Sequence, residues 1–221
     1  MLLTAGWLIS VVVFRVVSPP FTPLMAIRAV EYWWEGKAVE LRWEWTNLSD
    51  IPVHVQQAVI AAEDARYLQH WGIDPSAVED ALEGALEDSS ARKQVRGAST
   101  ITMQTVKNVF LWPSRSYVRK ALEAGMALLA GAVWGKRRTF ELYLNVIEWG
   151  EGVYGIDAAA RYHYGKGVEA LSSSEAAALA AILPSPRRVS ARRLSGLAWR
   201  RFGRIQREAP HIVVPEQFIR G

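Results

Sequence analysis

Two stretches of the chain carry the residues best suited to chemistry. The first, EDARYLQHWG, follows an apolar run and opens with the carboxylates Glu63 and Asp64. A helix over 53–69 would place Glu63, Tyr67 and His70 on one face, because they are spaced i, i+4 and i+7. Glu63 would then lie where an apolar helix becomes accessible to solvent. A partly desolvated carboxylate in that position can accept or give a proton near neutrality.

The second stretch is GASTITMQTVKN, over 97–108. Its glycine and small hydroxyl residues are typical of a helix start. Thr100, Gln104 and Lys107 follow at i, i+4 and i+7, so they form one stripe at the N-terminal end of that helix. A hydroxyl, an amide and a cation in such a stripe suit an anionic ligand, phosphate above all. Together the two stretches predict a proton-transferring carboxylate and an anion site.

Length and composition narrow the possible classes of protein. The 221 residues can bury one full core with an appendage, and the formal net charge is +4. There is no cysteine, which excludes disulfides, metal thiolates and a cysteine nucleophile. No zinc-finger spacing, RNA-binding signature, GxGxxG or P-loop occurs, so a nucleic-acid partner and a nucleotide fold are not expected. An anionic substrate or an anionic membrane surface accounts for the positive charge.

The elements that position these stretches are expected to be helices. Apolar periodicity and start and stop signals predict an all-α or nearly all-α chain, without internal repeats or an alternating strand pattern. A short alanine-rich segment occupies 153–164. The expected helices cover 53–69, 75–88, 100–111, a segment capped at Ser114 or Ser116 that ends near Trp134, 136–147, 172–183 and 194–208.

The N-terminal segment is strongly apolar. Residues 1–17 form a run that we interpret as an uncleaved transmembrane anchor, although a helix of that length spans only about 25 Å. A signal peptide and a buried core helix are the alternatives. Residues 18–48 are expected to be a juxtamembrane linker. Its tryptophans either lie at the bilayer interface or pack against the domain.

Five blocks in order carry a resemblance. They are EDARYLQHWG, GASTITMQTVKN, RKALE (119–123), KRRTFELYLNVIEWG (136–150), and GIDAAARYHYGK with SSSEAAALAAILPSPRR. Over residues 21–190 the chain resembles the peptidoglycan glycosyltransferases, most closely the monofunctional biosynthetic enzymes that lack a transpeptidase domain. The resemblance implies a lysozyme-like helical domain over 49–190 and a smaller lobe that rests on the membrane. A basic C-terminal helix and tail are expected over 191–221.

Two positions depart from the family pattern. Tyr67 stands where the family usually has phenylalanine, which keeps the ring. Met103 stands where the family usually has the first of two glutamines, before Gln104. Met103 would face away from the Thr100–Gln104–Lys107 stripe, so we expect little catalytic cost from it.

The resemblance also implies a mechanism. A lipid-linked growing strand is the donor, lipid II is the acceptor, and undecaprenyl pyrophosphate leaves with inversion. Glu63 would be the general base, and Lys107 and Arg119 would hold the pyrophosphate with help from Thr100 and Gln104. Glu123, the counterpart of the family's second essential glutamate, would orient these cations or share a divalent metal with the pyrophosphate.

The remaining assignments concern support, cofactors and location. No organic cofactor is expected, and no metal site made by protein ligands alone. Mg²⁺ or another divalent cation would be brought by the substrate pyrophosphate. The implied location is the bacterial cytoplasmic membrane, with a single pass and the catalytic domain outside, near other cell-wall synthesis proteins. The residues expected to shape the site are Asp64, Tyr67, His70, Gly97, Ser99, Asn108 and Asn145.

Two other classes of protein remain open from the sequence. A lysozyme-like lytic hydrolase would use Glu63 as general acid, but it has no need of a phosphate-binding stripe. A catalytically inactive membrane-anchored scaffold would keep the fold without the chemistry. The presence of Glu63, Lys107, Arg119 and Glu123 argues against the scaffold. Consumption of lipid II would distinguish a polymerase from both.

Overall fold

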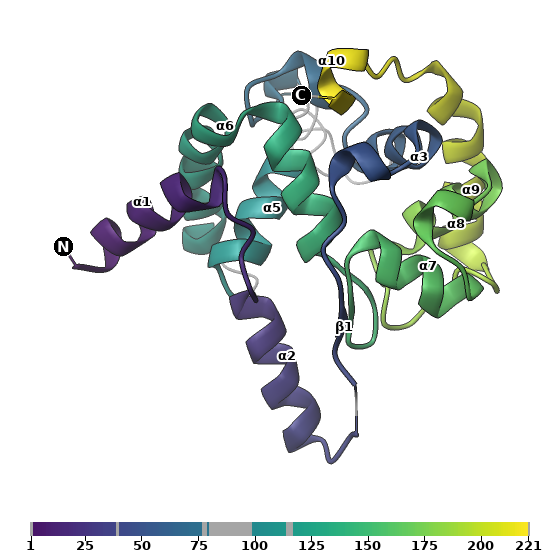
Figure 1. The fold of residues 1–221 in the computed structure, drawn as a ribbon, viewed down its shortest axis with the longest axis horizontal. Helices are drawn as coiled ribbons and strands as arrows, with labels where there is room; N and C mark the ends of the chain where they lie inside the picture. Colours follow the sequence, from purple (N-terminus) through teal and green to yellow (C-terminus); the bar gives the residue numbers. More distant parts are fainter. Residues whose placement is uncertain (1, 39, 77–78, 80–98, 114–116, 221) are drawn as a thin grey trace, which may run out of the picture.

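The computed structural model describes residues 2–38, 40–76, 79, 99–113 and 117–220. Most of these residues are helical, as Figure 1 shows, which confirms the expected nearly all-α class. The predicted helix over 75–88 falls almost wholly outside the described residues, as do Ser114 and Ser116. The α-helices are α1 (Leu2–Phe14), α2 (Pro23–Trp34), α3 (Val53–Glu63), α5 (Ile101–Phe110), α6 (Tyr117–Val146), α7 (Ile156–Tyr164), α8 (Ser173–Ile182), α9 (Gly196–Glu208) and α10 (Glu216–Arg220).

A small sheet joins two distant segments, although the sequence showed no strand pattern. Strands β1 (Arg42–Trp43), β2 (Glu148–Gly150) and β3 (Val153–Tyr154) lie in the order β1-β3-β2. β1 is parallel to β3, and β2 is antiparallel to it. Strands of two or three residues are too short for an alternating pattern, so side-chain periodicity cannot reveal them. The sheet holds the chain before α3 against the chain after α6.

Helix α3 ends at Glu63, so the prediction of one helix over 53–69 is wrong. Asp64 leaves the helical conformation with φ −160° and ψ 75°, and a 3₁₀ turn follows at Tyr67–Gln69. The Asp64 carboxylate accepts a hydrogen bond from the backbone N–H of Ile101, at the start of α5. This tertiary contact outweighs local helix propensity. Glu63 is therefore the last residue of α3, and Tyr67 and His70 do not share its helical face.

Helix α6 contains a sharp bend at Gly135. This residue has φ 67° and ψ 175°, a conformation that is essentially restricted to glycine. The bend separates 117–134 from 136–146, close to the two helices expected from the sequence. The first part of α6 packs along α5. Gly72 lies against this part, since a Cβ atom there would meet the Ala127 carbonyl at 3.0 Å.

Two apolar cores support the site. The main core combines α3, the second part of α6, and α7 to α10, and it includes Trp149, Ile205 and Phe218. The smaller core lies among α1, α5 and the first part of α6, and it includes Met103 and Trp134. Because α9 and α10 contribute to the main core, the sequence-based boundary after residue 190 does not coincide with a break in packing.

The N-terminal helix packs on the body of the protein. The Trp134 indole N–H donates to the Val11 carbonyl at 2.7 Å, and Arg138 Nε donates to the Phe14 carbonyl at 2.9 Å. The other face of α1 is open, with Val12 62 % exposed. Within the described residues, none of the helices has both the length and the apolar character needed to cross a bilayer.

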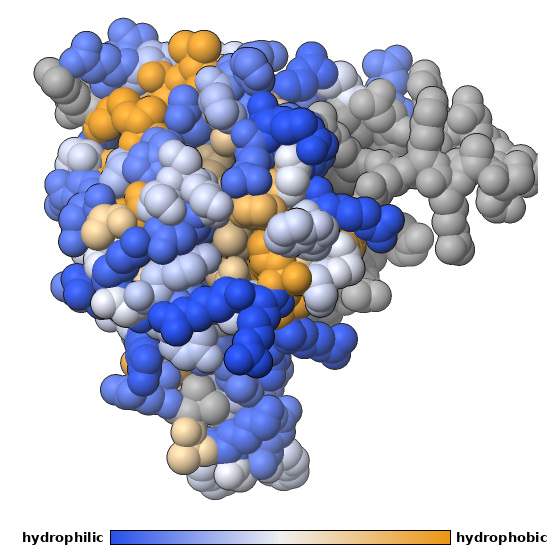
Figure 2. All heavy atoms as spheres, turned by 90° about the vertical axis from the view of Figure 1, so that its right-hand side faces the viewer, coloured by the Kyte–Doolittle hydropathy of each residue, from blue (hydrophilic) through white to orange (hydrophobic). Residues whose placement is uncertain are grey.

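Helix α2 extends away from the main body, toward the bottom of Figure 1. The Thr22 side chain caps it by accepting from the N–H of Met25. The Tyr32 hydroxyl donates to Glu148 Oε1 at 2.9 Å and so attaches α2 to the sheet. Trp33 and Trp34 point away from this contact and are mostly exposed. The right-hand side of Figure 1, which carries α7 to α9, is mainly hydrophilic with scattered apolar patches (Figure 2).

Candidate active site

Glu63 is held at both carboxylate oxygens. The Gln104 side-chain amide donates to Oε2 at 2.9 Å, and Arg201 Nη2 lies 2.7 Å from Oε1. The Glu63 side chain is 13 % exposed, so it is partly desolvated but still accessible. The carboxylate is therefore fixed in orientation at the end of α3, with contacts from α5 and α9.

Helix α5 presents Gln104 and Lys107 on its accessible face. Neighbouring Met103 and Val106 are buried in the smaller core, so Met103 does face away from the stripe. Within the part of the chain that the structure describes, the Lys107 ammonium has no hydrogen-bond or ion-pair partner. Burial lowers the pKa of Lys107, while the charges of Glu123 and Glu63 oppose that shift. Lys107 is a partly desolvated cation near both glutamates.

Three cationic side chains surround Glu123, which is only 2 % exposed. Arg119, one turn earlier on α6, is ion-paired with Glu123 Oε2. Lys120 Nζ lies 2.7 Å from Glu123 Oε1 and donates to the Ser99 hydroxyl, also at 2.7 Å. We call Lys107, Arg119, Lys120 and Glu123 the cation site. Three cations and one carboxylate leave it an excess charge of +2.

The arrangement suits one kind of reaction. Glu63 offers a fixed proton acceptor, and the cation site offers positive charge that is already in place. Desolvated cations bind phosphate oxygens strongly because the interaction is charge-assisted and poorly screened. A nucleophilic hydroxyl can lose its proton on one side while an anionic leaving group is stabilised on the other.

A divalent metal at Glu123 would compete with bonds already present. Both Glu123 oxygens face cationic side chains, one from Arg119 and one from Lys120. A metal ion at this carboxylate would have to displace one of those cations. The geometry therefore fits an orienting role for Glu123 better than a metal-ligand role, and we derive no step through a metal.

Thr100 and Asn108 support α5 from within. The Thr100 hydroxyl accepts from the Met103 N–H as an N-cap and donates to the Gly72 carbonyl. Asn108 is buried and donates to the Gln104 carbonyl at 2.8 Å. Direct contact of Thr100 with a ligand stays a prediction, since its hydroxyl is already engaged on both sides.

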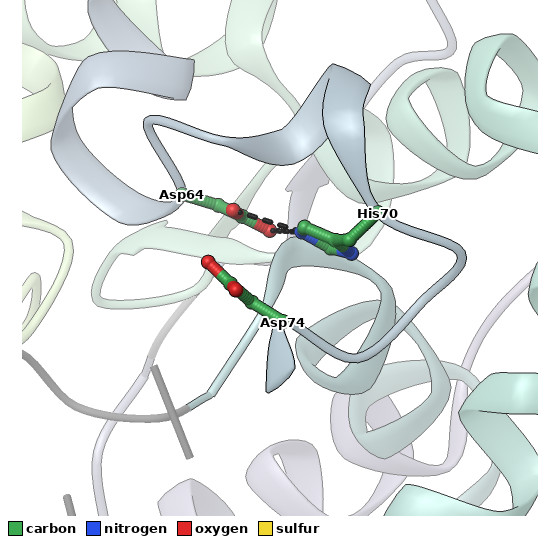
Figure 3. A group of neighbouring side chains, drawn as sticks. All are labelled: Asp64, His70 and Asp74. Atoms are coloured by element: carbon green, nitrogen blue, oxygen red, sulfur yellow. Dashed lines mark hydrogen bonds and ion pairs between the residues drawn. The ribbon is translucent and has the colours of Figure 1, made fainter. Parts of the chain in front are cut away.

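A second group of polar residues begins at Asp64, the residue that follows Glu63. Figure 3 shows the carboxylates of Asp64 and Asp74 beside the His70 ring. His70 Nε2 is 3.0 Å from both Asp64 oxygens, and its Nδ1 accepts from the Gly72 N–H at 3.2 Å. Because Nδ1 accepts, the proton of the neutral ring is on Nε2 and is donated to Asp64. Both ring nitrogens are thus engaged within the protein.

Lys136 adds a buried positive charge to this group, in which Asp74 also lies 4.0 Å from Arg66 Nη1. Burial lowers the pKa of Lys136 to about 8, against the opposing charges of Asp64 and Asp74. Its ammonium lies 4.1 Å from the centre of the Tyr67 ring. We call Asp64, His70, Asp74 and Lys136 the buried cluster. Ligand atoms of its two carboxylates and His70 lie within 4.8 Å of one another. The hydrogen bonds of His70 and the nearby ammonium favour a structural network over a metal centre.

Three other predicted site residues have different surroundings. Tyr67 is fully buried, and its hydroxyl donates to the Lys136 carbonyl at 2.6 Å. Asn145 is also buried and bonds both the N–H and the carbonyl of Thr46, so it braces the segment before α3. Neither residue contacts Glu63 directly. Gly97 lies outside the described residues.

Two residues of this site, Lys120 and Arg201, are not predicted from the sequence. Lys120 follows Arg119, and its spacing of i, i+3 to Glu123 matches a helical ion pair. Arg201 belongs to the basic C-terminal helix, 138 positions from Glu63 along the chain. Neither composition nor helical spacing relates residues that far apart.

The sequence profile of the Transglycosylase family matches residues 34–208. The chain belongs to the transglycosylase family. A biosynthetic peptidoglycan transglycosylase of Pseudomonas entomophila is 45 % identical over 97 % of this chain and 89 % of its own length. The protein of the same name from Stutzerimonas stutzeri is 44 % identical over 84 % of this chain and 77 % of its own length.

The residues matched by the family profile include the candidate site. The match begins within α2 and ends at the last residue of α9, so Arg201 and the cation site both lie inside the transglycosylase domain. The matched region is wider than the domain expected over 49–190, whose bounds stay a prediction. Membership of this family agrees with the resemblance seen in the five sequence blocks.

Proposed function

We propose that this transglycosylase polymerises lipid II into glycan strands and releases undecaprenyl pyrophosphate with inversion. The observation that carries the proposal is the fixed Glu63 carboxylate beside the cation site, on adjoining ends of α3, α5 and α6. Related proteins named biosynthetic peptidoglycan transglycosylases support the same class of reaction.

The residues present would perform the reaction as follows. A hydroxyl of the acceptor sugar attacks the anomeric carbon of the donor, and Glu63 accepts the hydroxyl proton. As the new bond forms, the bond between that anomeric carbon and the pyrophosphate oxygen breaks. Lys107 and Arg119 stabilise the negative charge that collects on the leaving pyrophosphate. Gln104 keeps the Glu63 carboxylate aligned throughout.

A lytic hydrolase on the same scaffold is less well supported. Such an enzyme needs a carboxylic acid that donates a proton to the leaving sugar. Glu63 instead forms an ion pair with Arg201, which is the contact of a carboxylate. Hydrolysis of a glycosidic bond also releases no phosphate, so it gives no role to Lys107 and the other cations.

The decisive experiment is polymerisation of lipid II in detergent by the wild-type chain and by Glu63→Gln. Wild type should form glycan strands, and the variant should lose about 10³-fold or more of the rate, since it keeps the shape but not the basicity. Glu169→Gln, at an exposed position, is the matched control and should act as wild type. Strands from Glu63→Gln at the wild-type rate would assign the base to another residue. Absence of strands from wild type would contradict the polymerase function.

Membrane association belongs to the same proposal. Exposed apolar side chains line the outer faces of α1 and the first part of α6, including Val12, Val118 and Leu128. Trp33 and Trp34 on α2 add amphipathic rings of the kind that favour the bilayer interface. We propose that these faces contact the outer surface of the bacterial cytoplasmic membrane, where a lipid-linked substrate resides.

Flotation with liposomes tests the membrane contact. The wild-type chain should float with vesicles that contain anionic lipid. A variant with Trp33→Ser, Trp34→Ser and Val118→Ser should remain partly at the bottom of the gradient. Tyr162→Ser, an exposed aromatic residue on α7, serves as the control. Equal flotation of the triple variant and wild type would contradict a role for these faces.

A further inference from the structure

We propose that Arg201 is the positioning residue of Glu63, so that α9 is part of the catalytic apparatus. This inference rests on the proposed function, in which Glu63 is the general base. The geometry behind it is that two side chains contact the two oxygens of the Glu63 carboxylate. Arg201 contacts Oε1 at 2.7 Å from α9, and Gln104 contacts Oε2 at 2.9 Å from α5.

Helix α9 is attached to the end of α3 at several points. Arg204 Nη1 donates to the Ala61 carbonyl at 3.1 Å, and Arg204 Nη2 donates to the Ala62 carbonyl at 3.3 Å. The last carbonyls of a helix lack partners within that helix, and cations are favourable there because of the helix dipole. The two arginines therefore cap α3 immediately before Glu63.

The two arginines have different tasks. Arg204 reaches only backbone carbonyls of α3 and is held in turn by Glu208 at 2.7 Å. Arg201 Nη2 donates to the Ala62 carbonyl at 3.5 Å and also reaches past the helix end to Glu63 Oε1 at 2.7 Å. Both arginines thus place the end of α3, and Arg201 in addition sets the rotation of the carboxylate itself.

The support behind Arg201 is rigid enough for this role. Ala198 and Ile205 on the inner face of α9 are buried, and Ile205 belongs to the main core. α9 packs against both α8 and α3. A base held on a packed helix stays close to its working geometry, and a displacement of about 1 Å can cost as much as 100-fold in rate.

Loss of Arg201 should affect turnover more than substrate binding. Without the guanidinium, the Glu63 carboxylate keeps only the Gln104 contact and can rotate away from the acceptor hydroxyl. Arg201→Gln should then lower kcat by about 30-fold to 100-fold with KM changed less than about threefold. Arg200→Gln is the matched control, because this neighbouring arginine is exposed and loses the same charge. It should retain the wild-type kcat and KM.

The kinetics separate failure of this inference from failure of the proposed function. If the wild-type chain makes no strands from lipid II, the proposed function fails. If wild type is active and Arg201→Gln matches Arg200→Gln, the positioning role is wrong. A rise in KM with unchanged kcat would also overturn it, since Arg201 would then act as a substrate-binding residue.

A second variant covers the case in which Arg201→Gln does not fold. Arg201→Ala leaves space for a free guanidinium ion, so millimolar guanidinium should restore part of kcat. Glu63→Gln should gain nothing from the same addition. A failure of guanidinium to raise the kcat of a folded Arg201→Ala protein, as judged by circular dichroism, would contradict the proposal.

Discussion

The cation site and the buried cluster flank Glu63, yet they are built in opposite ways. In the cation site, Lys107 has no partner among the described residues, and positive charge is in excess. In the buried cluster, each oxygen of Asp64 and each ring nitrogen of His70 takes part in a hydrogen bond. Excess positive charge on partly accessible side chains suits the first group to an anionic ligand. In the second group the Asp64–His70 pair is fully hydrogen-bonded, while Lys136 Nζ is buried without a hydrogen-bond partner among the described residues and faces the charges of Asp64 and Asp74.

Substitution of Lys107 should separate activity from stability. We expect Lys107→Met to lose about 100-fold or more of the polymerisation rate, because a preplaced positive charge at the leaving group is removed. Burial lowers the pKa of Lys107, so its charged form carries a cost in the folded state. The unfolding midpoint of the variant should therefore equal or exceed that of wild type.

Lipid II polymerisation and thermal unfolding, measured on the same preparations, check this expectation. Lys37→Met is a suitable control, since Lys37 is exposed in the turn after α2 and pairs with Glu35 and Glu151. A Lys107→Met protein with full activity would remove Lys107 from the site. A large drop in its unfolding midpoint would show that Lys107 supports the fold instead.

Substitution of Asp64 should give the opposite pattern. Asp64→Asn would turn an amide N–H toward the N–H of His70 Nε2 or of Ile101, and a buried donor would lose its acceptor. We expect a loss of about 2–3 kcal/mol in the free energy of unfolding, with a smaller loss of activity than in Lys107→Met. Urea unfolding measures the change. Asp50→Asn, at an exposed carboxylate, is the control, and equal stability of the two variants would contradict the buried-cluster assignment.

Lys136 should make stability depend on pH. Its pKa is lowered to about 8 in the folded protein from an ordinary value of 10.5. Between these values the unfolded chain binds more protons, so the contribution of Lys136 to stability increases as pH rises from about 8 to 10. The urea midpoint of Lys136→Met should show a smaller increase over that range than the midpoint of wild type. Identical pH dependence in the two proteins would contradict the assignment.

The smallest effect is expected from metal removal. Because His70 uses both ring nitrogens within the protein, EDTA should leave the unfolding midpoint of wild type unchanged, and added zinc should not raise it. Differential scanning fluorimetry would detect either change. A midpoint that zinc raises in wild type but not in His70→Asn would make the buried cluster a metal centre.

Local patterns in the sequence predicted the parts of the site that each lie within one helix. The spacing of Gln104 and Lys107 placed them on one face of α5, and Arg119 and Glu123 have the i, i+4 spacing of the ion pair that they form. Ser172 and Glu175 likewise have the spacing of a capping box, which α8 forms. These features depend on neighbours within four residues, which helical geometry relates directly.

Features that depend on distant neighbours could not be predicted. Helix α3 ends at Glu63 because Asp64 bonds to Ile101, a residue of another helix. The contact of Arg201 with Glu63 exists only because α9 packs on α3. The short sheet likewise depends on β1 and β3 meeting in the folded chain. Each of these follows from packing rather than from local propensity.

The bend at Gly135 sets the angle between the two parts of α6. Arg119 and Glu123 lie before the bend, while the residues after it are fixed in the main core with α3. Arg119 is roughly 24 Å from Gly135 along a helix that rises about 1.5 Å per residue. A change of only ~5° at the bend would thus move Arg119 by about 2 Å relative to Glu63. The distance between Glu63 and Arg119 therefore depends on the backbone angles of a single glycine, together with the packing of α6 on α5.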